Sequence, residues 1–196
     1  MRSALVLSTA RLRTALAGGI LALAACAGPG SGSFSYVSPV YDPALIWDAA
    51  RGDGVPTAIV GHPFAKSAAD VPDRVRTLLA MPPWHAPAPF VPADPLPARD
   101  YRVVLIFNPA PPGIGFGRAC QPANGFALAS PAGDVFIHAA FCFDDQTLTE
   151  VDARGLADDV DDPRFRALLA QTLADLLPAA NPGQDEACRR SLGRQC

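Results

Sequence analysis

The chain has 196 residues, a formal net charge of −3 at pH 7 and 49% hydrophobic residues. This length favours one domain, and the apolar fraction is large enough for a well-buried core. The slight acidic excess argues against binding to nucleic acid, and it argues equally against docking on a membrane through a polybasic patch.

The first 25 residues have the organisation of an export signal. Arg2, Arg11 and Arg13 precede an apolar stretch over residues 15–25, and no acidic residue lies in this part of the chain. A basic segment followed by a short apolar one is typical of a signal peptide. The apolar run is about half of the roughly 20 residues that a membrane-spanning helix needs. We therefore predict a signal peptide over residues 1–25.

The apolar run ends on Leu23-Ala24-Ala25-Cys26, and this motif resembles the lipobox of bacterial lipoproteins. The resemblance implies that Cys26 carries a diacylglyceryl group, that the signal is cleaved before Cys26, and that the new amino terminus is acylated. Several acyl chains together hold a protein firmly in a bilayer. Because alanine follows the cysteine, the resemblance further implies the outer membrane, with the protein facing the periplasm. The alternative is a structural cysteine after an ordinary secretory signal.

Four cysteines remain if Cys26 carries lipid, and an even number suits the oxidising periplasm. They are Cys120, Cys142, Cys188 and Cys196. Of the three possible pairings we favour Cys120 with Cys142, which joins a glycine-rich loop to a strand, and Cys188 with Cys196, which closes a short polar tail. Neither C-x-x-C nor H-x-x-x-H spacing occurs, so we predict no metal and no cofactor.

The mature chain begins with a segment rich in glycine and serine. Residues 26–40 are predicted to be a lipidated flexible tether, and residues 41–196 a single periplasmic domain. Removal of the signal takes away three arginines and leaves 13 basic residues against 19 acidic ones, a net charge of −6. The predicted partners are therefore the lipid bilayer and an envelope protein, not nucleic acid.

The first half of the domain contains two short helices, one strand and a proline-rich loop. Asp42-Pro43 predicts the start of a helix that Gly52 ends, and residues 57–60 are predicted to be a strand. Asp70 can cap a helix that runs to Met81, where two prolines stop it. Residues 82–97 include seven prolines and should form an extended loop. Its aromatic residues either pack on the domain, the favoured interpretation, or dock in a partner's groove.

The second half supplies most of the predicted sheet. Residues 101–107 form an apolar inner strand, residues 126–130 and 135–143 a hairpin, and residues 147–151 a further strand. Asp162-Pro163 starts a helix with a continuous apolar stripe that ends at Pro178. The prediction is an α+β domain, with a small antiparallel sheet of about four to five strands packed against two or three helices and braced by disulfides.

Two loops carry residue patterns that could serve chemistry. Gly113-x-Gly115-x-Gly117 suggests a phosphate cradle, but Cys120-Gln121-Pro122 follows instead of a helix, so an ordinary loop is favoured. The acidic cluster suggests calcium, but its residues lack EF-hand spacing and directly precede a predicted helix, whose positive end favours acids. Its members are Asp158, Asp159, Asp161 and Asp162.

The histidines offer no complete catalytic pattern. His138 and Cys142 share one face of a predicted strand, but four residues along a strand place them about 13 Å apart, too far for a nucleophile and its base. We therefore expect a buried histidine and a disulfide cysteine. His62 and His85 lie in loops without a spaced partner. No catalytic residue is assigned.

Three short phrases in the domain resemble uncharacterised lipoproteins of alphaproteobacteria. They are Gly61-His62-Pro63-Phe64, Ile106-Phe107-Asn108-Pro109 and Ala139-Ala140-Phe141-Cys142. The resemblance implies the same cellular location and no particular activity. We expect a membrane-anchored periplasmic lipoprotein with a non-catalytic binding or envelope-associated domain. The alternative is a periplasmic hydrolase in which His62, His138 and the aspartates of 158–162 converge.

Overall fold

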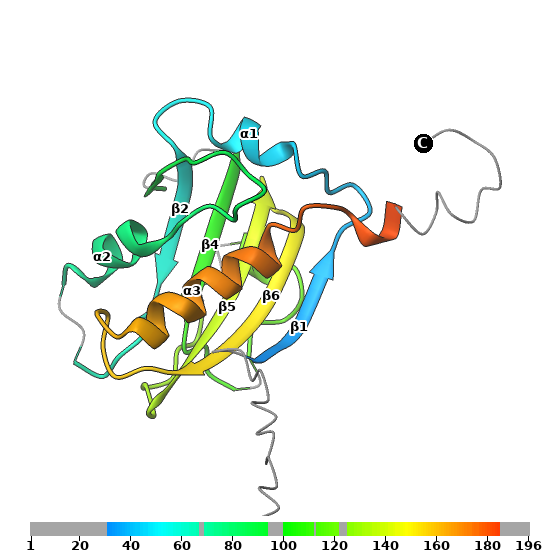
Figure 1. Cartoon of the computed structure of the whole chain (residues 1–196). Coiled ribbons are helices and arrows are strands. Elements are labelled where there is room, and N and C mark those ends of the chain that lie inside the picture. The colour runs from blue at the N-terminus through cyan, green and yellow to red at the C-terminus, as the bar shows by residue number, and fades with distance from the viewer. Residues whose placement is uncertain (1–30, 67–68, 94–99, 112, 122–124, 185–196) are drawn as a thin grey trace, which may run out of the picture.

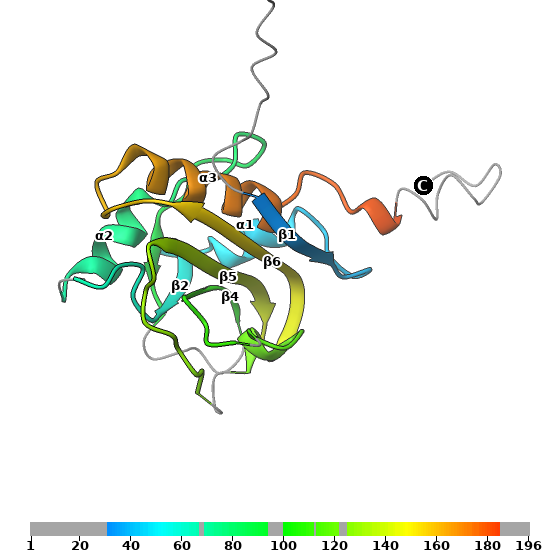
Figure 2. The ribbon, with the colours of Figure 1, turned by 90° about the horizontal axis from the view of Figure 1, so that it is seen from below.

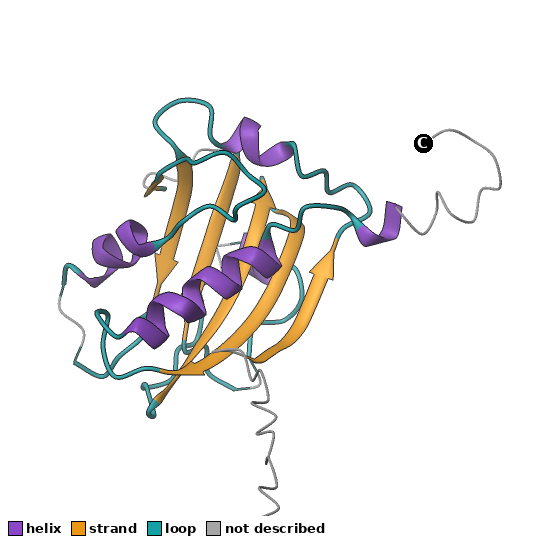
Figure 3. Ribbon diagram, viewed as in Figure 1, coloured by secondary structure: helices purple, strands orange, loops and turns teal. Residues whose placement is uncertain are grey.

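The computed structural model describes residues 31–66, 69–93, 100–111, 113–121 and 125–184. They form a six-stranded mixed sheet with helices on both faces (Figures 1 and 3). The strands are β1 (Ser31–Val37), β2 (Val55–Val60), β3 (Phe90–Pro92), β4 (Tyr101–Phe107), β5 (Asp134–Phe143) and β6 (Gln146–Leu156). The helices are α1 (Leu45–Ala49), α2 (Val71–Leu78), the 3-10 helix η1 (Arg118–Cys120) and α3 (Pro163–Leu176). Of these, α1, α2 and α3 lie on one face of the sheet and η1 lies on the other.

The α+β class is confirmed, but the sheet is larger than predicted and is mixed. Its strand order is β1-β6-β5-β4-β2-β3, and β2 runs parallel to both β3 and β4. The remaining pairs are antiparallel. The parallel arrangement follows from the connection after β2, because parallel neighbours require a long crossover and α2 with the proline-rich segment provides it.

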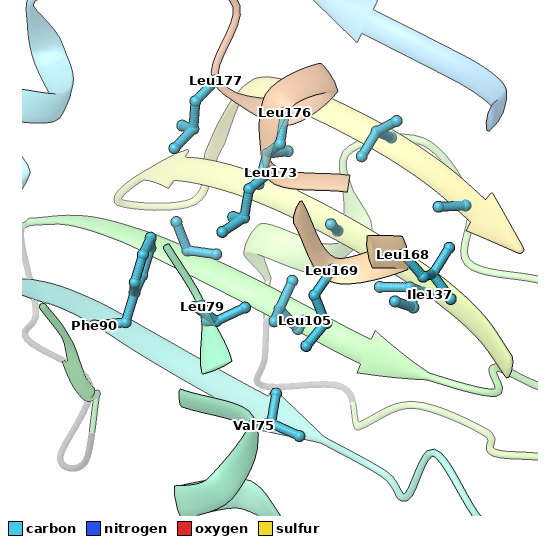
Figure 4. Close-up of a cluster of buried hydrophobic side chains, with 14 of the residues drawn as sticks. Val75, Leu79, Phe90, Leu105, Ile137, Leu168, Leu169, Leu173, Leu176 and Leu177 are labelled. Carbon is cyan, nitrogen blue, oxygen red and sulfur yellow. The ribbon is translucent and has the colours of Figure 1, made fainter. Parts of the chain in front are cut away.

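The main core lies between the sheet and α3. Asp162 caps α3, accepting a hydrogen bond from the Arg164 backbone N–H at 2.8 Å, and Pro163 occupies the first turn. The helix lays its apolar stripe across β5 and β6, and the same core includes Ile137 of β5 and Leu105 of β4 (Figure 4). The buried residues of the stripe are Phe165, Leu168, Leu169, Leu173 and Leu176. This element agrees closely with the sequence prediction.

The shorter helices differ from the prediction at their ends. The Asp42 carboxylate accepts a hydrogen bond from the Ala44 N–H at 2.8 Å, which forms a local turn, so α1 begins only at Leu45. The helix predicted to reach Met81 ends at Leu78, because Leu79 is extended and buries its side chain in the core.

Residues 31–40 do not belong to a flexible tether, which corrects the predicted boundary at residue 41. Residues 31–37 form β1, an edge strand paired with β6 from Ser31 opposite Arg154 to Val37 opposite Thr149. Small residues make this segment look like a linker, yet their backbone groups complete the ladder of β6 as well as larger residues would. Residues 31–37 therefore belong to the domain.

The predicted hairpin between residues 126–130 and β5 is also wrong. Both edges of β5 are occupied, one by β4 and the other by β6, so no edge is left for a further strand. Residues 126–130 make only one isolated bridge, between Leu128 and Pro109. They belong to the long connection from β4 to β5, which covers the sheet face opposite α3 (Figure 2).

The described part of the proline-rich segment, residues 82–93, packs on the domain, as favoured. The Trp84 indole N–H donates to the Leu177 carbonyl at 2.7 Å, and the side chain of Phe90 is buried in the core. Residues Phe90–Pro92 form β3, a strand that the sequence analysis missed. Proline is tolerated there because β3 lies at the edge of the sheet.

Candidate functional site

A cluster of ionisable side chains lies on the sheet face opposite α3. Strand alternation turns His138 and Cys142 of β5 to this face, together with Glu150 and Asp152 of the neighbouring β6. The register places Asp152 directly opposite His138, and Glu150 opposite Ala140. Two acidic residues of one strand therefore flank a histidine of the next.

The imidazole of His138 contacts both carboxylates. Its Nδ1 atom donates to the Asp152 Oδ1 atom at 2.6 Å, and its Nε2 atom lies 2.9 Å from the Glu150 Oε1 atom, at ion-pair distance. The side chains of His138 and Glu150 are 2% and 1% exposed, whereas that of Asp152 is 24% exposed. The cluster is thus closed to solvent except at Asp152.

The two carboxylates control the protonation of His138. Burial alone would lower the pKa of His138, but the contacts with Asp152 and Glu150, together with their negative charges, raise it to about 9. The imidazole is therefore protonated at neutral pH and neutralises part of the buried acidic charge. A protonated imidazole donates protons and cannot accept one, so His138 is not a general base in this state.

The glycine-rich loop closes over this cluster. The Gly117 N–H donates to the Glu150 Oε2 atom at 2.9 Å, and Gly117 has a positive φ of 74°, which glycine adopts without strain. The Phe116 ring packs edge-on against Tyr36 of β1, with ring centroids 4.5 Å apart. The loop is followed by the three-residue η1, not by an α-helix. Its third glycine therefore binds a carboxylate of the protein itself.

A disulfide bond joins the end of this loop to β5. Cys120 and Cys142 are both fully buried and are bonded to each other, which is the pairing that the sequence analysis favoured. The buried guanidinium of Arg102 supports the same corner, since its Nη2 atom donates to the Cys120 carbonyl at 2.7 Å. Because Cys142 is oxidised, it is no nucleophile. Cys26, Cys188 and Cys196 lie outside the described residues.

Three of the four aspartates before α3 are paired with arginines, and the fourth, Asp159, accepts a hydrogen bond from the Asp161 backbone N–H at 2.8 Å. Arg164 contacts Asp158 at 2.7 Å and Asp162 at 2.6 Å, and Arg74 contacts Asp161. The hydrogen bond from Arg164 lowers the pKa of Asp162 well below its usual range. Within the described part of the chain, no group of three or more histidine, cysteine or acidic residues could hold a metal ion. The aspartates therefore stabilise the N-terminal end of α3.

The other two histidines contact other parts of the fold. His85 lies against the end of α3, with its Nε2 atom 3.3 Å from the Leu177 carbonyl, and burial lowers its pKa. It borders an open cavity of about 530 Å³ lined mainly by the prolines of residues 80–89. His62 follows β2 and is exposed, and its carbonyl accepts from the Asn108 side chain at 2.8 Å.

The sequence analysis singled out His138 but missed its partners. Glu150 and Asp152 alternate along β6, and the turn at residues 144–145 brings them opposite Ala140 and His138. A hairpin register drawn from that turn alone would have placed Val151 opposite His138, because it lacks the bulge between Phe141 and Cys142. Of the aspartates of 158–162, which we had considered as partners, Asp158, Asp161 and Asp162 pair with arginines instead.

Comparison of the chain with protein-family models, curated proteins and solved structures found no match. None of the helices in the described ranges has the length and hydropathy that crossing a bilayer requires.

Proposed function

We propose that this chain is a lipoprotein of the bacterial cell envelope, attached to the outer membrane through acylated Cys26 and facing the periplasm. Its domain, in this proposal, is a non-catalytic module that binds an envelope partner or contributes to envelope structure. The anchor rests on the Leu23-Ala24-Ala25-Cys26 motif. An independent feature of the domain supports the same location.

That feature is the buried disulfide bond between Cys120 and Cys142, and it carries the proposal. Disulfides form and persist in oxidising compartments such as the periplasm, and they are rare in the bacterial cytosol. Both cysteines are fully buried and join the β4–β5 connection to the centre of the sheet. A bond in this position stabilises the fold of an exported protein and has no evident redox role.

The state of the His138 cluster supports a non-catalytic domain. A catalytic base must reach its substrate, yet His138 is 2% exposed and lies beneath the loop that Gly117 ties to Glu150. A periplasmic hydrolase is the second candidate, because the contact of one histidine with two carboxylates resembles the start of a catalytic arrangement. For hydrolysis, the loop would have to move away from Glu150. His138 would also have to lose its proton.

The anchor is tested by metabolic labelling with radioactive palmitate and membrane fractionation in a Gram-negative host. The unaltered chain should incorporate label and sediment with membranes, whereas Cys26→Ser should lose the label and appear in the soluble fraction. Cys196→Ser is the matched control and should behave like the unaltered chain. Membrane association of Cys26→Ser without label would contradict the proposal.

A further inference from the structure

Two exposed leucines lie at one end of the sheet, the end at which β1 starts. Leu156 is the last residue of β6 and is 65% exposed, and Leu128 is 43% exposed. Leu128 bridges to Pro109, just beyond the end of β4, and lies against the turn at Gly61 that ends β2. We name Leu128 and Leu156 the leucine edge.

The leucine edge adjoins the point where the chain enters the domain. Ser31, the first residue of β1, pairs with Arg154 of β6, so Leu156 lies two residues further toward the incoming chain. In Figure 1 this is the lower end of the sheet, where β1 begins and the arrows of β2 and β4 point. The opposite end carries α1 and the turn after β1.

The lipidation site lies close to this end in the sequence. Only four residues lie between Cys26 and Ser31, which are thus five residue steps apart. Because an extended chain advances at most about 3.6 Å per residue, the first residue of β1 lies no more than about 18 Å from the backbone of Cys26. A tether this short holds the leucine edge close to the bilayer surface. Even weak apolar contacts between the edge and the lipid then form for much of the time.

The charges beside the leucine edge are largely paired, which reduces the penalty for approaching lipid. Asp134, opposite Leu156 in the ladder, lies 3.4 Å from Arg154. Asp158, two residues after Leu156, pairs with Arg164 at 2.7 Å. Exposed leucines flanked by neutralised acids suit the headgroup boundary of a bilayer better than bulk water.

We propose that the leucine edge rests on the bilayer surface, so that the strands stand away from the membrane and the α1 end faces the periplasm. The inference depends on lipidation of Cys26, proposed above. The leucine edge contacts lipid and not a protein, because the short tether already holds this end of the domain at the bilayer.

The test uses the full-length lipidated protein in vesicles of phosphatidylethanolamine and phosphatidylglycerol, with or without brominated acyl chains, which quench nearby tryptophan. Leu156→Trp places an indole at the leucine edge. Val40→Trp is the matched control, because Val40 is 66% exposed and follows β1 at the opposite end. Emission of the unaltered protein, which contains Trp47 and Trp84, is subtracted.

Brominated lipid should quench at least half of the emission added by Leu156→Trp and little of that added by Val40→Trp. Adding Leu128→Asp to Leu156→Trp should reduce the quenching. Equal, weak quenching at both positions in protein that floats with the vesicles would overturn the inference and leave the anchor intact. Protection of the indole from acrylamide without quenching by lipid would assign the edge to a protein and would also overturn it. Protein that fails to float refutes the anchor itself.

Discussion

His138 and its two carboxylates form a buried ionic cluster that joins three parts of the chain. Glu150 faces His138 with one oxygen and binds the Gly117 N–H with the other. Asp152 holds the opposite side of the imidazole ring. Taking such charges out of water costs free energy, so the cluster stabilises the fold only while its contacts are complete. Removal of one partner leaves the others uncompensated.

The first prediction concerns the pH dependence of stability. The pKa of His138 is about 9 in the fold against 6.5 in the unfolded chain. The folded protein therefore binds more protons between these values, so the stabilisation is complete below pH 6.5 and is lost as the pH rises to about 9 and beyond. At 1.36 kcal/mol per pKa unit, the unfolding free energy should fall by up to about 3 kcal/mol across this window. Denaturant titrations at several pH values measure it.

The control for this prediction is the exposed His62. His138→Gln should be less stable than the unaltered protein near pH 6.5 and should show a flatter profile up to pH 9, whereas His62→Gln should keep the full slope. A His138→Gln profile with the original slope would assign the dependence to another group.

At the scale of elements, the connection between β4 and β5 acts as a cover for the sheet face opposite α3. Asn108 fastens its start by binding both the His62 carbonyl and the Phe136 backbone N–H. The Gly117–Glu150 hydrogen bond fastens the middle, and the disulfide at Cys120 holds a point further along. A long connection without strands is thus fixed by a few specific bonds.

The second prediction concerns the disulfide of this cover. The bond closes a loop with a sequence separation of 22, and its removal should lower the unfolding free energy by about 3 kcal/mol, chiefly because the unfolded chain gains freedom. We expect a Cys120→Ala/Cys142→Ala variant to unfold at lower guanidinium concentration than the unaltered protein under oxidising conditions. Under reducing conditions the difference between the two should largely disappear.

Cys188→Ser/Cys196→Ser serves as the matched control and tests the second predicted pair separately. A reductant should lower the stability of this variant as much as it lowers the stability of the unaltered protein. If it becomes insensitive to reductant, the stabilising bond involves the tail and the assignment to Cys120 and Cys142 is wrong.

The elements differ in how far the sequence determines them. α3 and β4 were predicted well, because a helical apolar stripe and an apolar inner strand are local patterns. β1 and β3 were missed, because glycine, serine and proline disguise edge strands whose pairing depends on distant partners. The hairpin at residues 126–130 was predicted from turn residues, and the competing pairing of β5 with β4 overrode it. Long-range pairing was the missing information.

The candidate site shows the same division. Strand alternation predicted that His138 and Cys142 share a face. Their separation of four residues along the strand predicted that they do not form a catalytic pair. The partners of His138 depend on the register between β5 and β6 and on a bulge between Phe141 and Cys142, which local patterns do not reveal. The role of Gly117 depends in addition on the path of a loop across the sheet.

At the scale of the whole molecule, β1 completes the sheet on the side of the predicted anchor. It pairs with β6 along its length, and the segment that follows is held by the C-terminal part of the chain. The Asn181 side chain donates to the Ser38 carbonyl at 2.8 Å and to the Tyr41 carbonyl at 2.9 Å. The Tyr41 hydroxyl donates to the Pro178 carbonyl at 2.9 Å. The N-terminal segment is therefore part of the domain and not a spacer.

The third prediction follows from this arrangement. A domain secreted without its anchor and starting at residue 31 should fold, whereas one starting at residue 38 lacks β1 and leaves an edge of β6 unpaired. The loss of a strand ladder and of the packing of Tyr36 on Phe116 removes several kcal/mol. For a domain of this size, 1 kcal/mol shifts the Tm by about 2–4 °C, so the shorter protein should melt about 10 °C lower or aggregate. Scanning calorimetry and light scattering on the two proteins measure this, and equal melting would show that residues 31–37 are a spacer after all.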